Sequence, residues 1–202
     1  SVSDKGTNEL LLVSGYSGIG KTALVNEVHK PIARQHGYFI AGKFDQYRRN
    51  IPYTALIQAF QDLIRQVFSE ETDRVDQFKT ALVEALGNNG QVLINVIPEL
   101  EQILGPQPEI EQLAPSETRT RFINTMLQFV SVFAKAEHPL AIFLDDLQWA
   151  DLASFQFIKS LITENSTNYV LLIGAYRDNE VTSSHPLMLT VDALKRDGAS
   201  IN

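Results

Sequence analysis

The fold is decided by the stretch Leu10-Leu11-Leu12-Val13-Ser14-Gly15-Tyr16-Ser17-Gly18-Ile19-Gly20-Lys21-Thr22. Residues 15–22 match the pattern G-x-x-x-x-G-K-[ST] at every fixed position. The apolar run before them predicts a buried strand, and residues 22–35 have helical character, although Pro31 is expected to end or kink that helix. A strand, a glycine-rich turn and a helix in this order predict a phosphate-binding loop.

Each fixed residue of the loop has a physical task. Glycines let backbone N–H groups approach phosphate oxygens, and the unpaired N–H groups at the start of the helix point at the same anion. Lys21 is expected to reach the β- and γ-phosphates, and the Thr22 hydroxyl to ligate Mg²⁺, so ATP and Mg²⁺ are the predicted cofactors. The residues expected to contact the nucleotide are Gly15, Ser17, Gly18, Ile19, Gly20, Lys21, Thr22 and Ala23.

Two carboxylates, Asp145 and Asp146, follow the strongest strand signal in the chain, residues 140–144. Ligands of a parallel sheet bind beyond the carboxyl ends of its strands, where the phosphate loop also lies. Asp145 is therefore expected to hold Mg²⁺, usually through a bound water, and Asp146 to orient or deprotonate the attacking water. Two acids after an apolar run can also be a solvated strand end. The 124-residue separation from Lys21 leaves room for an extra strand between the two motif strands.

Arg177 follows another apolar run, residues 171–176. A cation at that strand end can sense the γ-phosphate and stabilise charge that develops during phosphoryl transfer. The alternative is a surface arginine that pairs with Asp178 or Glu180. For the segment after Asp146, a structural role is at least as well supported as a catalytic one. In the structural interpretation, Trp149, the only tryptophan, packs against the next helix, and Asp151 is the N-cap of that helix.

Short apolar runs that alternate with helical patterns predict an α/β fold of three layers with a mostly parallel sheet. Residues 53–136 carry apolar side chains at i, i+3 and i+4 spacing for too long to form a single crossover, so we expect an extra helical insertion there. Residues 199–202 read as the start of a strand. Residues 1–202 are interpreted as one domain and as a fragment of a larger protein.

Composition narrows the possible partners. The chain has 17 Lys and Arg against 24 Asp and Glu, which gives a net charge of −7. This charge disfavours sequence-independent binding to nucleic acid. The absence of cysteine excludes disulfides and thiolate metal sites, and the four histidines are scattered without ligand spacing. No apolar run approaches the length of a membrane span and the N-terminus lacks a signal-peptide layout, so a cytoplasmic, non-membrane domain is expected.

Together these elements resemble the AAA-like ATPase domain of STAND signalling NTPases. The likeness is to the origin-recognition-like version found inside large bacterial multidomain serine/threonine and histidine signalling kinases. It spans almost the whole chain. Beyond the loop it includes Gly42-Lys43-Phe44-Asp45-Gln46, Asn50-Ile51-Pro52-Tyr53, Phe143-Leu144-Asp145-Asp146-Leu147-Gln148-Trp149-Ala150-Asp151 and Gly174-Ala175-Tyr176-Arg177-Asp178-Asn179-Glu180-Val181.

The resemblance implies an additional-strand P-loop NTPase that acts as a nucleotide-controlled switch. Lys21 and Thr22 would then belong to the Walker A loop, Asp145 and Asp146 to Walker B, and Arg177 would be the first sensor. Many AAA motors have Glu where this chain has Asp146, and the shorter acid fits slow hydrolysis. The resemblance also implies C-terminal lid and winged-helix parts, which we expect to lie outside residues 1–202. The implied partners are other domains of the same polypeptide, namely kinase, helical-repeat and sensor modules, with nucleotide-dependent self-association as a further option.

Four other functions compete with this interpretation. A non-hydrolysing ATP-binding module has the same loop, and a DNA-associated AAA ATPase is suggested by kinship alone. A small-molecule kinase would need a lid and an acceptor pocket, which the sequence does not identify. A GTPase is disfavoured because no Asn-Lys-x-Asp stretch is present to read guanine.

The Arg48-Arg49 pair could reach phosphate or a neighbouring protomer, but a solvated loop accounts for it more simply.

Overall fold

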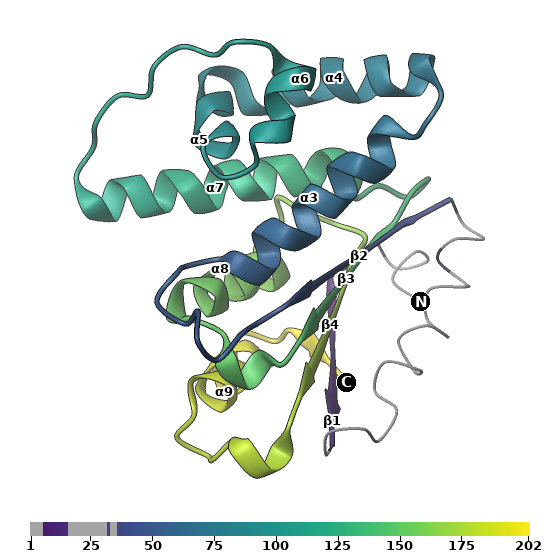
Figure 1. Ribbon diagram of the computed structural model, residues 1–202. Helices are drawn as coiled ribbons and strands as arrows, with labels where there is room; N and C mark the ends of the chain where they lie inside the picture. The colour runs from purple at the N-terminus through teal and green to yellow at the C-terminus, as the bar shows by residue number, and fades with distance from the viewer. Residues whose placement is uncertain (1–5, 16–31, 33–35) are drawn as a thin grey trace.

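The computed structural model describes residues 6–15, 32 and 36–202, and within them a five-stranded sheet forms the centre of the molecule (Figure 1). The strands are β1 (Glu9–Ser14), β2 (Tyr38–Lys43), β3 (Leu140–Asp145), β4 (Val170–Tyr176) and β5 (Ser200–Ile201). Their order is β2-β3-β4-β1-β5 and every pairing is parallel. The predicted α/β class with a mostly parallel sheet is confirmed, and the arrangement is consistent with a P-loop NTPase fold. The extra strand is β4, which lies between β1 and β3.

The register of the strands brings their carboxyl ends to one edge of the sheet. Ser14, the last residue of β1, lies opposite Tyr176 at the end of β4. Leu144 of β3 pairs with Gly174 of β4, and Asp145 pairs with Lys43 at the end of β2. The segments that leave these four strands therefore start side by side at one edge.

Helices fill the long interval between β2 and β3 and follow β3 and β4. In Figure 1, α3 lies against the sheet, and α4 to α7 form a further layer beyond it. The α-helices are α3 (Thr54–Phe68), α4 (Thr72–Leu86), α5 (Gly90–Ile94), α6 (Glu101–Leu104), α7 (Pro115–Phe133), α8 (Leu152–Thr163) and α9 (Pro186–Arg196). Short 3-10 turns occur at η1 (Gly87–Asn89), η2 (Pro98–Leu100), η3 (Leu147–Trp149) and η4 (Asp178–Glu180).

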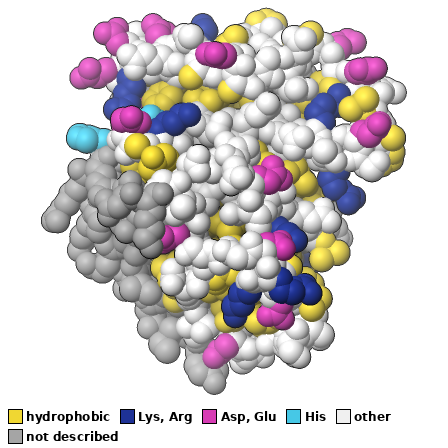
Figure 2. All heavy atoms as spheres, turned by 180° about the vertical axis from the view of Figure 1, so that it is seen from behind, with side chains coloured by type: hydrophobic (Ala, Val, Ile, Leu, Met, Phe, Trp, Pro, Cys, Tyr) yellow, Lys and Arg dark blue, Asp and Glu magenta, His cyan; other side chains and the backbone are white. Residues whose placement is uncertain are grey.

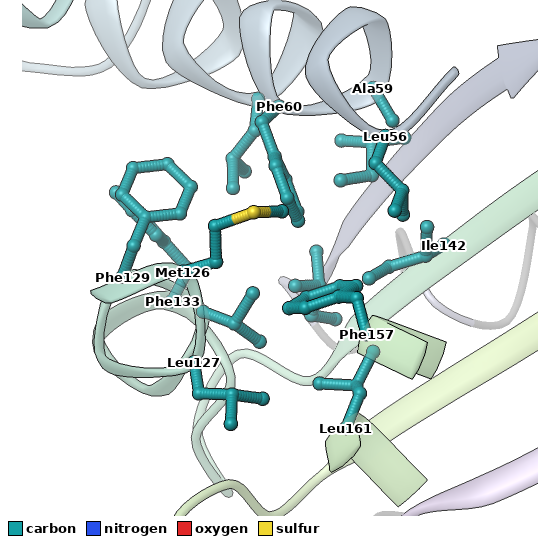
Figure 3. Packing of buried hydrophobic residues seen from close by; sticks show 14 of the residues in the cluster. Leu56, Ala59, Phe60, Met126, Leu127, Phe129, Phe133, Ile142, Phe157 and Leu161 are labelled. Carbon is teal, nitrogen blue, oxygen red and sulfur yellow. The ribbon is translucent and has the colours of Figure 1, made fainter. Parts of the chain in front are cut away.

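A cluster of aromatic rings joins the helical layer to the sheet (Figure 3). Phe60 of α3 lies with its ring centroid 5.4 Å from that of Phe129 on α7 and 6.2 Å from that of Phe157 on α8. All three rings are buried, and Ile142 of β3 points into the same cluster. Because successive strand residues face opposite sides, Phe143, Ile173 and Ala175 form a second, smaller cluster on the other face.

The surface carries charge of both signs. On the face drawn in Figure 2, the described Lys and Arg side chains are interspersed with Asp and Glu and form no continuous basic patch. Among the helices in the described ranges, none combines the length and apolar character that a bilayer span requires.

Tyr38 makes stability depend on pH in the alkaline range. Its burial and the neighbouring Glu70 carboxylate, which accepts a hydrogen bond from the Tyr38 hydroxyl, raise the pKa of Tyr38 from 10.0 to about 12. A raised pKa means that the stabilisation is complete below about pH 10 and is lost as pH rises toward 12. We expect the unfolding free energy of the wild type to fall by about 1.4 kcal/mol per pH unit more than that of Tyr38→Phe in this window. Urea unfolding of both proteins measures the difference, and parallel pH curves would contradict it.

Candidate functional site

The phosphate-binding loop lies mostly outside the described residues. Tyr16 to Thr22 and the following Ala23 belong to the part that the structure does not describe, so the roles of Lys21 and Thr22 stay predictions. Gly15 is described: it is buried, it follows β1 directly, and its φ of 151° is a conformation that side chains rarely adopt. Ser14 and Tyr176 are the last partners across β1 and β4, so Gly15 and Arg177 are the residues with which the chain leaves these two strands.

The two predicted acids lie at the end of β3 and are oriented differently. Asp145 is the last residue of the strand, and its side chain is 24% exposed. Its Oδ1 accepts a hydrogen bond of 2.9 Å from the Asp146 backbone N–H. Asp146 adopts a left-handed conformation, with φ of 54°, and is only 4% exposed. Asp tolerates this conformation better than most residues, and such outliers cluster at functional sites. A merely solvated strand end would not bury the second acid.

Lys43 forms ion pairs with both acids. Sequence reasoning did not predict this contact. Its ammonium lies 3.3 Å from Asp146 Oδ2 and 3.8 Å from Asp145 Oδ2. The position follows from sheet register, since Lys43 and Asp145 are direct partners across β2 and β3. Gly42 fixes the end of β2 against α3, because a Cβ at this position would lie 1.9 Å from the Ala55 carbonyl oxygen.

Arg177 pairs with Glu180, as the alternative interpretation expected, and also lies against Asp146, while its role as a γ-phosphate sensor stays a prediction. Its Nε lies 3.4 Å from Asp146 Oδ1, so it belongs to the acidic site, and its guanidinium also pairs with Glu180 at 2.9 Å. The guanidinium carbon lies 4.9 Å from the centre of the Trp149 ring, a cation–π contact. The Trp149 indole N–H donates to Glu180 at 3.1 Å. Trp149 and Glu180 thus hold Arg177 at the mouth of the site.

Gln148 is a second residue that sequence reasoning missed. It is 2% exposed, and both ends of its amide are used: Nε2 donates to Asp146 Oδ1 at 3.0 Å, and Oε1 accepts the Arg177 backbone N–H at 3.2 Å. Its own carbonyl oxygen lies 3.1 Å from His185 Nε2. Since His185 Nδ1 accepts the Leu187 N–H at the start of α9, Nε2 carries the proton and donates to Gln148. A glutamine between Leu and Trp gives no sequence signal for this role.

Asp151 has the structural role predicted for it. Its side chain accepts the Ser154 N–H at 2.8 Å and caps α8. The same carboxylate accepts the Tyr53 N–H at 3.2 Å, so it also fixes the start of α3. Trp149 lies in the η3 turn against the core and is bound to Arg177 and Glu180.

An open groove of about 690 Å³ is lined in part by Lys43 and Trp149. Arg48 lies on its wall, whereas Arg49 does not. The lining residues are Lys43, Phe44, Asp45, Gln46, Tyr47, Arg48, Thr54, Ile57, Gln58, Gln61 and Trp149. Lys43 lines this groove and 62% of its side chain is exposed, so the side chain has space to move away from the acids.

The donor set fits Mg²⁺ held jointly with phosphate. Within the described ranges, no group of three or more His, Cys, Asp or Glu side chains converges as a self-sufficient metal site. Mg²⁺ bound to nucleotides uses one or two carboxylates and takes its other ligands from phosphate and water. Asp145 offers a partly exposed carboxylate at the strand end, and the nearby ammonium of Lys43 shows that a cation is favoured there.

Comparison with known proteins assigns the family. Residues 1–173 match the family model described as the AAA ATPase domain. The chain belongs to this AAA ATPase domain family, and the match includes β1 to β3 and most of β4.

Several curated proteins that carry the name histidine kinase are similar to this chain. The chain is 39% identical over 161 residues to "Hybrid signal transduction histidine kinase G" of Dictyostelium discoideum. This alignment covers 80% of the chain and 5% of the relative. It is 28% identical over 187 residues to "Peroxide stress-activated histidine kinase mak2" of Schizosaccharomyces pombe, and this alignment covers 83% of the chain and 8% of the relative. "Histidine protein kinase 1" of Candida albicans is 22% identical over 176 residues, covering 80% and 7%. The chain therefore spans less than a tenth of the length of each.

Proposed function

We propose that this chain binds ATP with Mg²⁺, hydrolyses it slowly, and serves as a nucleotide-controlled switch in a multidomain signalling protein. The proposed phosphate-binding residues are Gly15 to Thr22 with Ala23. Thr22 and Asp145 would hold Mg²⁺, while Lys21, Asp146 and Arg177 would act on the reacting phosphate. The single observation that supports this most is the meeting of Gly15, Arg177 and the Asp145–Asp146 pair at the carboxyl edge of one parallel sheet.

The proposal assigns chemistry that the residues can perform. A bound Mg²⁺ would neutralise charge on the phosphate oxygens. Asp146, whose carboxylate is held by Gln148, would accept a hydrogen bond from the attacking water. Arg177 would turn its guanidinium toward the γ-phosphate, a site of charge in the transition state. These interactions would act in a partly buried place, where they are stronger than in bulk water.

The switch role is supported by the kind of protein in which similar segments occur. The relatives are histidine kinases in which the matching segment is a small part of a much longer chain, as a regulatory module would be. A STAND-type switch requires that ATP and ADP bind its two states with different affinity. Arg177 is suited to report the difference, because its guanidinium bridges Asp146 and Glu180 and stacks on Trp149.

Calorimetric titration tests the binding step. We expect ATP to bind in the presence of Mg²⁺, ADP to bind with a different affinity, and GTP to bind more weakly. Lys21→Ala should lose measurable ATP binding, since the variant removes the charge that faces the phosphates. Lys79→Ala, which removes an exposed lysine of α4, is the matched control and should bind like the wild type. Equal ATP affinity in Lys21→Ala and the wild type would refute the assignment of the loop.

A further inference from the structure

Lys43 holds a position that a simple nucleotide site does not require. It is the last residue of β2, and its ammonium contacts the carboxylates of both Asp145 and Asp146. The backbone around it is fixed: its N–H donates to Gln58 Oε1 at 3.2 Å, and the next N–H, that of the buried Phe44, donates to the Asp145 carbonyl at 3.1 Å. The side chain is different, because 62% of it is exposed.

The charges of the cluster show what Lys43 does there. Among the described residues, Lys43 and Arg177 face the three carboxylates of Asp145, Asp146 and Glu180, so this set of side chains carries one negative charge in excess. Without Lys43, among the cations of the described residues, only Arg177 would remain beside these two carboxylates, and its ion pairs are with Asp146 and Glu180. Like charges so close repel each other, and a cation between them relieves the repulsion.

We propose that Lys43 is the resident counter-ion of Asp145 and Asp146 and that it competes with the divalent metal for them. This inference rests on the proposed function, because it takes Asp145 as the metal ligand. The ammonium lies 3.8 Å from Asp145 Oδ2, and a metal ion bound to that oxygen would repel it. The groove beside Lys43 gives the ammonium a place to go, so metal loading and release of Lys43 from the acids are one event.

The consequence is a site that resists metal until a nucleotide arrives. An intramolecular ammonium is always present, whereas Mg²⁺ must displace it and lose part of its own hydration. Triphosphate supplies further ligands for the metal and a new anionic partner for the displaced ammonium. Lys43 would thereby make metal binding depend on nucleotide more strongly than the two carboxylates alone would.

The test measures Mn²⁺ binding to nucleotide-free protein through the electron paramagnetic resonance signal of free Mn²⁺. Lys43→Gln and Lys43→Met remove the charge and are expected to tighten Mn²⁺ binding by up to about fivefold, the upper end of what a solvent-screened ion pair contributes. Lys43→Arg should behave like the wild type. Lys159→Gln is the matched control: it removes the same charge from α8, where Lys159 pairs with Asp197, and should leave Mn²⁺ affinity unchanged.

Two results would overturn the proposal. One is an equal Mn²⁺ affinity in the wild type, Lys43→Gln and Lys43→Met. The other is an equal gain in Lys43→Gln and Lys159→Gln, which would reveal an effect of net charge alone. Adding Asp145→Asn to Lys43→Gln should remove the gain, and a gain that persists would place the metal elsewhere. Because this titration contains no nucleotide, a failure to bind ATP would count against the proposed function and not against the competition at the acids.

Discussion

Replacing Asp146 by Asn is expected to lower ATP turnover by about 100-fold while ATP affinity stays close to that of the wild type. Asn keeps the size of the side chain and tolerates the left-handed conformation at this position, where φ is 54°. What it loses is a carboxylate oxygen that can accept a proton or a hydrogen bond from the attacking water. Arg177 keeps its ion pair with Glu180, so the site should remain assembled.

Phosphate release under single-turnover conditions measures this effect, with calorimetry of ATP on the same samples. Asp178→Asn is the matched control, since it removes a neighbouring exposed carboxylate that takes part in none of the ion pairs found in the described part of the chain. Equal turnover in Asp146→Asn and the wild type would remove Asp146 from the reaction. If the wild type binds ATP and releases no phosphate at all, the chain is the non-hydrolysing module instead.

Gly42→Ala is expected to lower the free energy of unfolding by about 3 kcal/mol. At a position with open space, exchanging glycine for alanine in a strand stabilises, because the unfolded chain loses freedom. Here the added Cβ would lie 1.9 Å from the Ala55 carbonyl oxygen and 2.7 Å from its carbonyl carbon. These are backbone atoms of the first turn of α3, so the whole helix must shift away from β2.

Urea unfolding monitored by circular dichroism checks this prediction. Gly90→Ala is the control, since the atom that its Cβ would meet first is the end of the flexible Gln107 side chain at 2.7 Å. The control should change stability by less than about 1 kcal/mol. A Gly42→Ala protein as stable as Gly90→Ala would mean that α3 is not held against β2 as the structure shows.

Much of the fold followed from local sequence. The run at residues 140–144 is apolar throughout because a parallel strand is buried on both faces, and this makes it recognisable without partners. Asp151 was recognised as a helix cap because a cap depends on neighbours three residues away. The long interval before Asp145 holds β2 and the helices α3 to α7, whereas the strand that lies between β1 and β3 is β4, which follows Asp145 in the chain. Residues 199–202 were expected to begin a strand, and Ser200–Ile201 pairs with β1.

The candidate site was predicted only in part. The order of the strands and the apolar runs place Asp145, Asp146 and Arg177 at one edge, which sequence reasoning expected. Sequence reasoning did not predict the contacts among these side chains. The partners of Lys43 are about a hundred residues away in the chain, and both α8 and β4 separate Gln148 from Arg177. The phosphate loop, from Tyr16 to Thr22, is a sequence prediction that the described residues leave to experiment.

The amino-acid sequence alone determined the class of fold, the loop motif and the positions of the strand-end acids, because each of these depends on residues adjacent in the chain or on a repeating pattern. Only the tertiary structure decided which cations face those acids. Register between β2 and β3 placed Lys43 beside Asp145, and the turn at Asp146 aimed its carboxylate at Arg177 and Gln148. These ion pairs form between residues that are far apart in the sequence and adjacent only in the folded sheet, so no local sequence pattern specifies them.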